Sequence, residues 1–196
     1  DTDLTDDLLN SERVYVIAAG TSYNAGWASK AIMEKVAKIP TEVHLASEFA
    51  YDIPLLSEKP FFIFLTQSGE TADSRQALVK VNELGHPSLT ITNVKGSTLS
   101  REASHTLLLH AGPEIAVAST KAYTSQITLL AILAIHFAEI LKRNIDKAEE
   151  LKNDILLLPS QVEETLKTAE QIKKFAHKVY KEKDMFFIGR GADYTV

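Results

Sequence analysis

Five short runs of apolar and β-branched residues, separated by longer segments with helical spacing, constrain the fold of this chain more than any other feature. The predicted strands are residues 13–19, 42–45, 61–65, 88–93 and 105–110. The central runs are continuously apolar, which is typical of strands covered on both faces of a parallel sheet. Strands that alternate with helices favour right-handed βαβ units, so we expect an α/β domain with an open, doubly wound sheet.

The pattern changes after the fifth predicted strand, where only long helical segments follow. These segments cover residues 119–143, 146–158 and 161–181. We expect Pro159 to separate the last two, because proline cannot donate the hydrogen bond that continues a helix. We therefore expect residues 1–12 to be an N-terminal leader and residues 13–183 to form one domain with C-terminal helices.

Composition excludes several classes of function. The 196 residues carry a formal net charge of −5, so nothing resembles the basic surface of a nucleic-acid-binding protein. The chain has no cysteine, which excludes disulfides and thiolate metal sites within it. Its six histidines show no ligand spacing, so we expect no metal and no other cofactor. An anionic ligand would have to be bound by local dipoles and hydroxyl groups, because the overall field is mildly repulsive.

Nothing in the sequence predicts a membrane partner or secretion. The longest mostly apolar stretch, residues 127–138, is too short to cross a bilayer. The N-terminus is acidic, unlike a signal peptide, so a cytoplasmic location is expected. The chain begins with Asp1 and not with methionine, so we expect it to be a segment of a longer protein.

Two hydroxyl-rich turns follow predicted strands. GTSYN (20–24) comes after the first strand, and TQSGET (66–71) comes after the third. In an open α/β sheet, ligands bind beyond the carboxyl ends of the strands, where the N-termini of the following helices favour an anion. Ordinary helix capping is the alternative for either turn alone. Two such turns in one sheet favour a phosphate monoester, held without the lysine that a P-loop requires.

A third turn of the same kind, VASTK (117–121), follows the fifth predicted strand. It again places hydroxyl groups where a long helix begins. We expect it to border the same ligand site.

The end of the chain resembles its beginning. Residues 185–194 (MFFIGRGADY) align without a gap on residues 14–23 (VYVIAAGTSY). Both read as an apolar strand, a glycine, two further residues and a tyrosine. We expect residues 184–196 to be the first strand of a second, truncated domain of the same type.

Four segments, in order, resemble the sugar isomerase (SIS) family. They are GTSYNAG (20–26), ASEFAY (46–51), QSGETADS (67–74) and ASTKAYTSQ (118–126). The sequences of the four segments are most similar to the first of two SIS domains in aminotransferases that make glucosamine 6-phosphate. This resemblance implies a three-layer αβα sandwich with a five-stranded parallel sheet, a flavodoxin-like doubly wound fold.

The resemblance also implies roles for individual residues. The residues that it assigns to the substrate phosphate are Ser22, Thr66, Gln67, Ser68 and Thr71. Those assigned to the sugar are Thr21, Val117 and Ser119. No catalytic residue is expected here, because the family's carboxylate base, lysine and histidine belong to the second SIS domain and the C-terminal tail.

The expected function is therefore binding of fructose 6-phosphate or glucosamine 6-phosphate within a larger, glutamine-dependent enzyme. The expected partners are a second SIS domain and a glutaminase domain of the parent chain, with a homodimer formed through the helix at residues 119–143. One alternative is an SIS domain of a fructosamine-6-phosphate deglycase or of a ketose-phosphate isomerase/deaminase. Another is the sugar-phosphate sensor module of a regulator.

Overall fold

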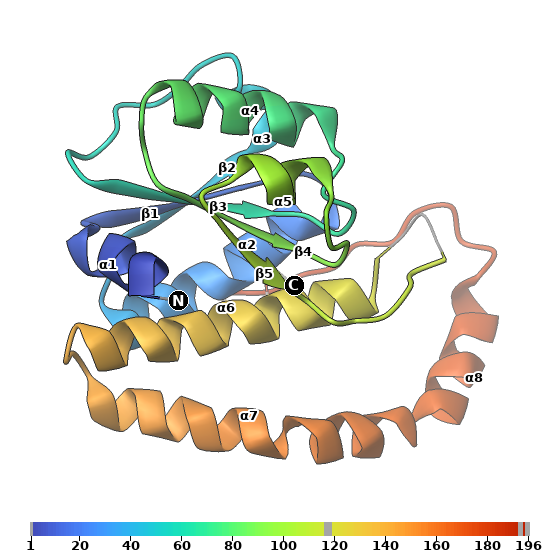
Figure 1. Cartoon of the computed structure of the whole chain (residues 1–196). Coiled ribbons are helices and arrows are strands. Elements are labelled where there is room, and N and C mark those ends of the chain that lie inside the picture. The colour runs from blue at the N-terminus through green and yellow to red at the C-terminus, as the bar shows by residue number, and fades with distance from the viewer. Residues whose placement is uncertain (1, 116–118, 192–193, 195–196) are drawn as a thin grey trace.

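The protein is built on one five-stranded sheet, and the computed structural model describes residues 2–115, 119–191 and 194 (Figure 1). The strands are β1 (Arg13–Ala18), β2 (Thr41–Leu45), β3 (Pro60–Leu65), β4 (Ser88–Thr92) and β5 (His105–Leu108). Their order is β2-β1-β3-β4-β5 and every neighbouring pair is parallel. The predicted parallel sheet is confirmed, with strand ends that differ from the sequence prediction by at most two residues.

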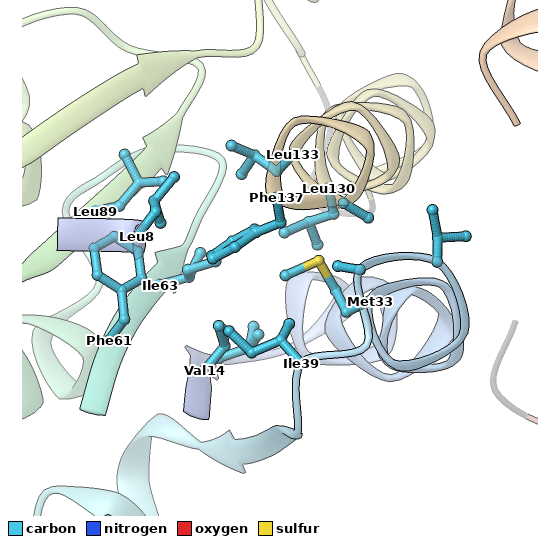
Figure 2. Close-up of a cluster of buried hydrophobic side chains, with 14 of the residues drawn as sticks. Leu8, Val14, Met33, Ile39, Phe61, Ile63, Leu89, Leu130, Leu133 and Phe137 are labelled. Carbon is cyan, nitrogen blue, oxygen red and sulfur yellow. The ribbon is translucent and has the colours of Figure 1, made fainter. Parts of the chain in front are cut away.

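One face of the sheet packs on two long helices, α2 (Thr21–Ile32) and α6 (Lys121–Ile140). Val14 and Val16 of β1 point into this layer and are buried. Figure 2 shows Phe137 of α6 reaching toward the strand residues of the same cluster. Because consecutive strand residues point to opposite faces, the alternate residues of β1 must be covered from the other side.

That second face is covered by α3 (Ala46–Phe49), α4 (Ala72–Glu83) and α5 (Thr98–Glu102). Tyr15 and Phe62 lie in the core there, 1% and 0% exposed, and their stacked rings are 5.2 Å apart between centroids. Burial on both faces explains why β1 and β3 read as continuous apolar runs. The three-layer αβα sandwich predicted from the family resemblance is confirmed.

The N-terminal segment is part of this core. Residues Thr2–Asn10 form helix α1, whose Leu8 is fully buried in the cluster between the sheet and α6. A carboxylate oxygen of Asp7 lies 2.7 Å from Nε2 of His105 on the edge strand β5. Within the segment predicted as a leader, Thr2–Asn10 thus form a helix whose Leu8 packs into the core.

Helix α2 begins inside the GTSYN segment, at Thr21, with Gly20 as its N-cap. It continues as a π-helical turn, η1 (Met33–Ala37). This start places Thr21 and Ser22 in the first turn of a helix.

Helix α6 lies within the helical segment predicted at residues 119–143 and is shorter by two residues at its start and three at its end. It is long and apolar enough, by length and composition alone, to cross a membrane. In the fold it is a core helix that packs against α2, η1 and α7 (Ile145–Leu166). Ile132 is its one large apolar side chain that is exposed, and self-association through α6 stays a prediction.

The prediction that Pro159 separates two helices is wrong. α7 runs through Pro159 to Leu166, and α8 (Ala169–Val179) follows after a short turn. Pro159 lies on an exposed part of α7, where water can bind the carbonyl oxygen that the missing N–H leaves free. Loss of one hydrogen bond therefore does not end the helix.

The described residues after α8 form no strand. Phe186 and Ile188 are 88% and 97% exposed. A strand needs a neighbouring strand to bond with, and β1–β5 form the one sheet among the described residues. The start of a second SIS domain at residue 184 stays a prediction.

Candidate functional site

A polar pocket lies at the carboxyl ends of β1 and β3. These strands are neighbours in space, but the chain leaves β1 toward one sheet edge and returns to β3 on the other side. Ligands of doubly wound folds bind at this topological switch point. The pocket has a volume of about 450 Å³, which fits a small phosphorylated sugar. Its described lining residues are Ala19, Gly20, Thr21, Ser22, Leu65, Thr66, Gln67, Ser68, Thr71, Glu114 and Ser119.

The loop after β1 turns sharply at Gly20, which has a φ of +58°. Thr21 and Ser22 follow in the first turn of α2. Ser22 is buried, and its Oγ accepts a hydrogen bond of 2.8 Å from Nε2 of Gln126 on α6. Gln126 is itself 1% exposed, so a buried amide fixes the position of the Ser22 hydroxyl.

The loop after β3 folds around Gly69, which has a φ of +70°. The N–H of Gly69 donates to Oγ1 of Thr66 at 3.1 Å, and the N–H of Glu70 donates to Oγ of Ser68 at 3.2 Å. The hydroxyl groups of Thr66 and Ser68 therefore shape the turn and also line the pocket.

Neighbouring elements brace this second loop from behind. The carbonyl oxygen of Gln67 accepts from the N–H of Asn93 at 3.0 Å, and that of Gly69 accepts from the N–H of Leu99 at 3.0 Å. The Glu70 carboxylate accepts a hydrogen bond of 2.9 Å from the N–H of Thr98. Hydrogen bonding by the side chain and the backbone of Thr98 holds the pKa of Glu70 below its usual value. Glu70 thus stabilises the start of α5 and is not among the described residues that line the pocket.

Two helices begin at the pocket without a side-chain cap. The N-cap of α2 is Gly20, which has no side chain, and the side chain of Thr71, the N-cap of α4, makes no capping hydrogen bond. The first N–H groups of a helix lack partners within the helix and carry a partial positive charge. Ordinary capping, the alternative for both turns, is therefore absent at α2 and α4. The arrangement suits an anion that binds where the two helices converge.

A third segment, at the start of α6, closes another side of the pocket. Ser119 Oγ donates to the Glu114 carboxylate at 2.9 Å, and the N–H of Thr120 donates to the same carboxylate at 2.9 Å. The N–H of Thr120, with the Ser119 hydroxyl, lowers the pKa of Glu114. Lys121 donates to the carbonyl oxygen of Pro113, so its ammonium group is held outside the described lining of the pocket.

The structure brings seven of the eight predicted site residues into this one pocket. Val117, the eighth, lies outside the described residues. Sequence reasoning missed Glu114 and Gln126. Gln126 had a signal, because it is a polar residue at the head of an apolar helix and closes the fourth SIS-like segment. Among the described residues no group of acidic or histidine side chains could hold a metal ion.

Comparisons with known proteins identify the family of the chain. The SIS domain model matches residues 7–136. The chain is 53% identical over 197 aligned residues to a glutamine–fructose-6-phosphate aminotransferase (isomerizing) of Oceanobacillus iheyensis, and 54% identical to that of Staphylococcus aureus. It covers 32% of each of these relatives, and each alignment covers all of this chain.

A solved structure gives the same result. The C-terminal domain of glucosamine-fructose-6-phosphate aminotransferase from Francisella tularensis is similar with a TM-score of 0.90 and 34% identity. The similarity covers 100% of this chain and 55% of that structure. Because the SIS domain model matches residues 7–136, the chain belongs to the SIS domain family.

Proposed function

We propose that this chain binds the phosphate group of fructose 6-phosphate and of glucosamine 6-phosphate, within a longer enzyme that makes the second from the first with glutamine as nitrogen donor. The observation that carries the proposal is the pocket at the β1/β3 switch point, where hydroxyl groups meet two uncapped helix N-termini. The identity of the sugar phosphate and the reaction in this proposal are taken from the names of the relatives.

The lining of the pocket supports a division of roles. The residues proposed to bind the phosphate are Ser22, Thr66, Gln67, Ser68 and Thr71. Thr21 and Ser119 are proposed to bind sugar hydroxyls, together with the backbone of Val117. Hydrogen bonds to a charged oxygen are about twice as strong as neutral ones, so several hydroxyl and N–H donors can replace the missing lysine or arginine.

Phosphate binding serves the reaction from a distance. Binding energy from a part of the substrate that does not react holds the reacting carbons in place. The relatives are about three times as long as this chain, which leaves room for the groups that open the sugar ring and move its proton. We propose that these groups belong to a second SIS domain, that a glutaminase domain supplies ammonia, and that the whole protein is a cytoplasmic homodimer.

Calorimetric titration of the chain with fructose 6-phosphate, glucosamine 6-phosphate and unphosphorylated fructose tests the proposal. The two phosphates should bind and fructose should not. Equal binding of fructose and its 6-phosphate would contradict a phosphate site. Failure of both phosphates to bind a folded chain would overturn the proposal.

A further inference from the structure

We infer that Glu114 makes the sugar side of the pocket selective for charge: it favours sugar phosphates that carry an ammonium group away from the phosphate, and it disfavours those that carry a second anionic group there. The inference rests on the proposed function, because it concerns the same pocket. It adds the class of sugar phosphate that the pocket prefers and assigns the preference to one residue.

The charge of the pocket lining comes from Glu114. It is the one ionisable side chain among the described residues that line the pocket, whose other polar side chains are hydroxyl groups and the amide of Gln67. The N–H of Thr120 and the hydroxyl of Ser119 bond to the charged form and lower the pKa of Glu114. A carboxylate that is ionised at neutral pH therefore borders the ligand.

The segment that carries Glu114 is anchored to the sheet by Asn93, which directly follows β4. Oδ1 of Asn93 accepts from the N–H of Ala111 at 3.0 Å, and its Nδ2 donates to the carbonyl oxygen of Gly112 at 2.6 Å. The backbone N–H of Asn93 donates to the carbonyl oxygen of Gln67 at 3.0 Å. One residue thus ties the wall that carries Glu114 to the loop proposed to hold the phosphate, which keeps the carboxylate in the pocket.

The carboxylate itself is held at the start of α6. Its two oxygens accept from Ser119 Oγ and from the N–H of Thr120, each at 2.9 Å, and the N–H of Ala122 also bonds to it. A carboxylate has about four acceptor positions, so one stays open for a donor of the ligand. An ammonium group matches that position in hydrogen bonding and in charge, a hydroxyl group matches it in hydrogen bonding alone, and a second anion is repelled.

Other charges near the pocket set the size of the effect. Lys121 donates to the carbonyl oxygen of Pro113 and, with the partial positive charge at the start of α6, offsets part of the charge of Glu114. Glu114 is also partly exposed to water, which screens it. Asp73 in the first turn of α4 is a further negative charge, outside the described lining. We therefore expect preferences of about threefold.

Two pairs of ligands, each differing in one group, test the inference by calorimetry at pH 7 and constant ionic strength. Glucosamine 6-phosphate has an ammonium group where glucose 6-phosphate has a hydroxyl, since an amine that resembles an α-amino group is mostly protonated at pH 7. 6-Phosphogluconate has a carboxylate where sorbitol 6-phosphate has a hydroxymethyl group. Glucosamine 6-phosphate should bind about threefold more tightly than glucose 6-phosphate, and 6-phosphogluconate about threefold more weakly than sorbitol 6-phosphate.

Three variants assign the preference to a residue. Glu114→Gln removes the charge but keeps the size and one acceptor oxygen, so both affinity ratios should become about one. Glu114→Asp keeps the charge on a shorter side chain, so both preferences should keep their direction even where the bonds to Ser119 and Thr120 are lost. Glu83→Gln makes the same change at the exposed last residue of α4, about 18 Å along the helix from Thr71, and should leave both ratios unchanged.

The outcomes separate this inference from the proposed function. Equal affinities within each pair, in a parent chain that binds sugar phosphates, would overturn the inference and leave the proposed function standing. Preferences that persist in folded Glu114→Gln would belong to another charge, such as Asp73, and would also overturn it. If no sugar phosphate binds at pH 7, both proposals fail.

Discussion

The two loops that meet at the pocket are held in different ways. The loop after β3 is braced by backbone hydrogen bonds to β4 and α5 and by the close contact of Gly69 with Ser97. The loop after β1 has no such support at Gly20, around which nothing lies within 4 Å of an added Cβ. Its hydroxyl is positioned by one distant side chain, Gln126.

The two loops therefore differ in whether the groups that hold the loop in place are also the groups proposed to bind the ligand. In the β3 loop the backbone bonds to Asn93 and Leu99 hold most of the shape, and the Ser68 hydroxyl adds one exposed bond from the N–H of Glu70, so removing Ser68 and Thr71 should change the shape little. In the β1 loop the Ser22 hydroxyl is both a binding group and the partner of a buried amide. We therefore expect substitutions in the β3 loop to affect either folding or binding, and substitutions in the β1 loop to affect both.

The largest effect should come from Gly69→Ala. A Cβ at Gly69 would lie 2.0 Å from Oγ and 2.5 Å from Cβ of Ser97, at a positive φ. Backbone strain and overpacking together should lower the free energy of unfolding by about 4 kcal/mol. Gly20→Ala, which has the strain without the clash, should cost about 1 kcal/mol. Urea unfolding of both variants measures the difference, and equal costs would mean that the β3 loop is not braced as described.

The next largest effect should be on binding. Ser68→Ala combined with Thr71→Ala should weaken fructose 6-phosphate binding by about 2–4 kcal/mol, because two donors to a charged group are lost. The free energy of unfolding should fall by about 1 kcal/mol or less, since the one hydrogen bond lost, from the N–H of Glu70 to Ser68 Oγ, is exposed. Thr165→Ala on the exposed surface of α7 is the control. Unchanged affinity in a folded double variant would remove this loop from the phosphate site.

Ser22→Ala should reduce both stability and affinity. The variant leaves the buried Nε2 of Gln126 without its acceptor, which should cost about 1–2 kcal/mol in the free energy of unfolding. Affinity for fructose 6-phosphate should fall by about 1–2 kcal/mol from the lost donor. Urea unfolding and calorimetry on the same preparation measure the two effects. Loss of affinity at full stability would show that Gln126 does not depend on Ser22.

The smallest effect concerns the hydrogen bond from the N–H of Thr98 to the Glu70 carboxylate. Glu70 is fully exposed, and hydrogen bonds from Thr98 lower its pKa below the usual 4.5. A lowered folded-state pKa contributes stability above pH 4.5 that is lost as the pH falls through the folded value. Glu70→Gln should therefore be slightly less stable than the parent at pH 7, and the gap should close in acid. Unfolding midpoints in urea at pH 7 and about pH 3.5 test this, and a gap that widens in acid would contradict it.

The sheet was predictable because its strands are buried on both faces. Runs such as Phe61–Leu65 have no polar residue to shift their register, and all six residues of β3 are buried. The positions of the two binding loops followed, since each comes directly after such a strand. The residue list of the site came from the family resemblance and not from these patterns alone.

Two features could not be read from local sequence. The bond between Ser22 and Gln126 joins residues 104 positions apart, and no pattern of neighbours predicts which buried polar groups meet. The helix break predicted at Pro159 is wrong, because the cost of proline in a helix depends on whether water reaches the freed carbonyl. Both depend on the surroundings that the finished fold provides.

The bond between Ser22 and Gln126 also has a consequence for the time at which the protein becomes able to bind. The two residues are 104 positions apart in the chain. At about 5–20 residues per second, a ribosome adds Gln126 roughly 5–20 s after Ser22. During that interval the strands of the switch point are made before α6 can dock, so the nascent domain lacks the amide that orients its first binding hydroxyl. Ligand capture should therefore be a late event of synthesis, delayed until α6 has closed over the sheet.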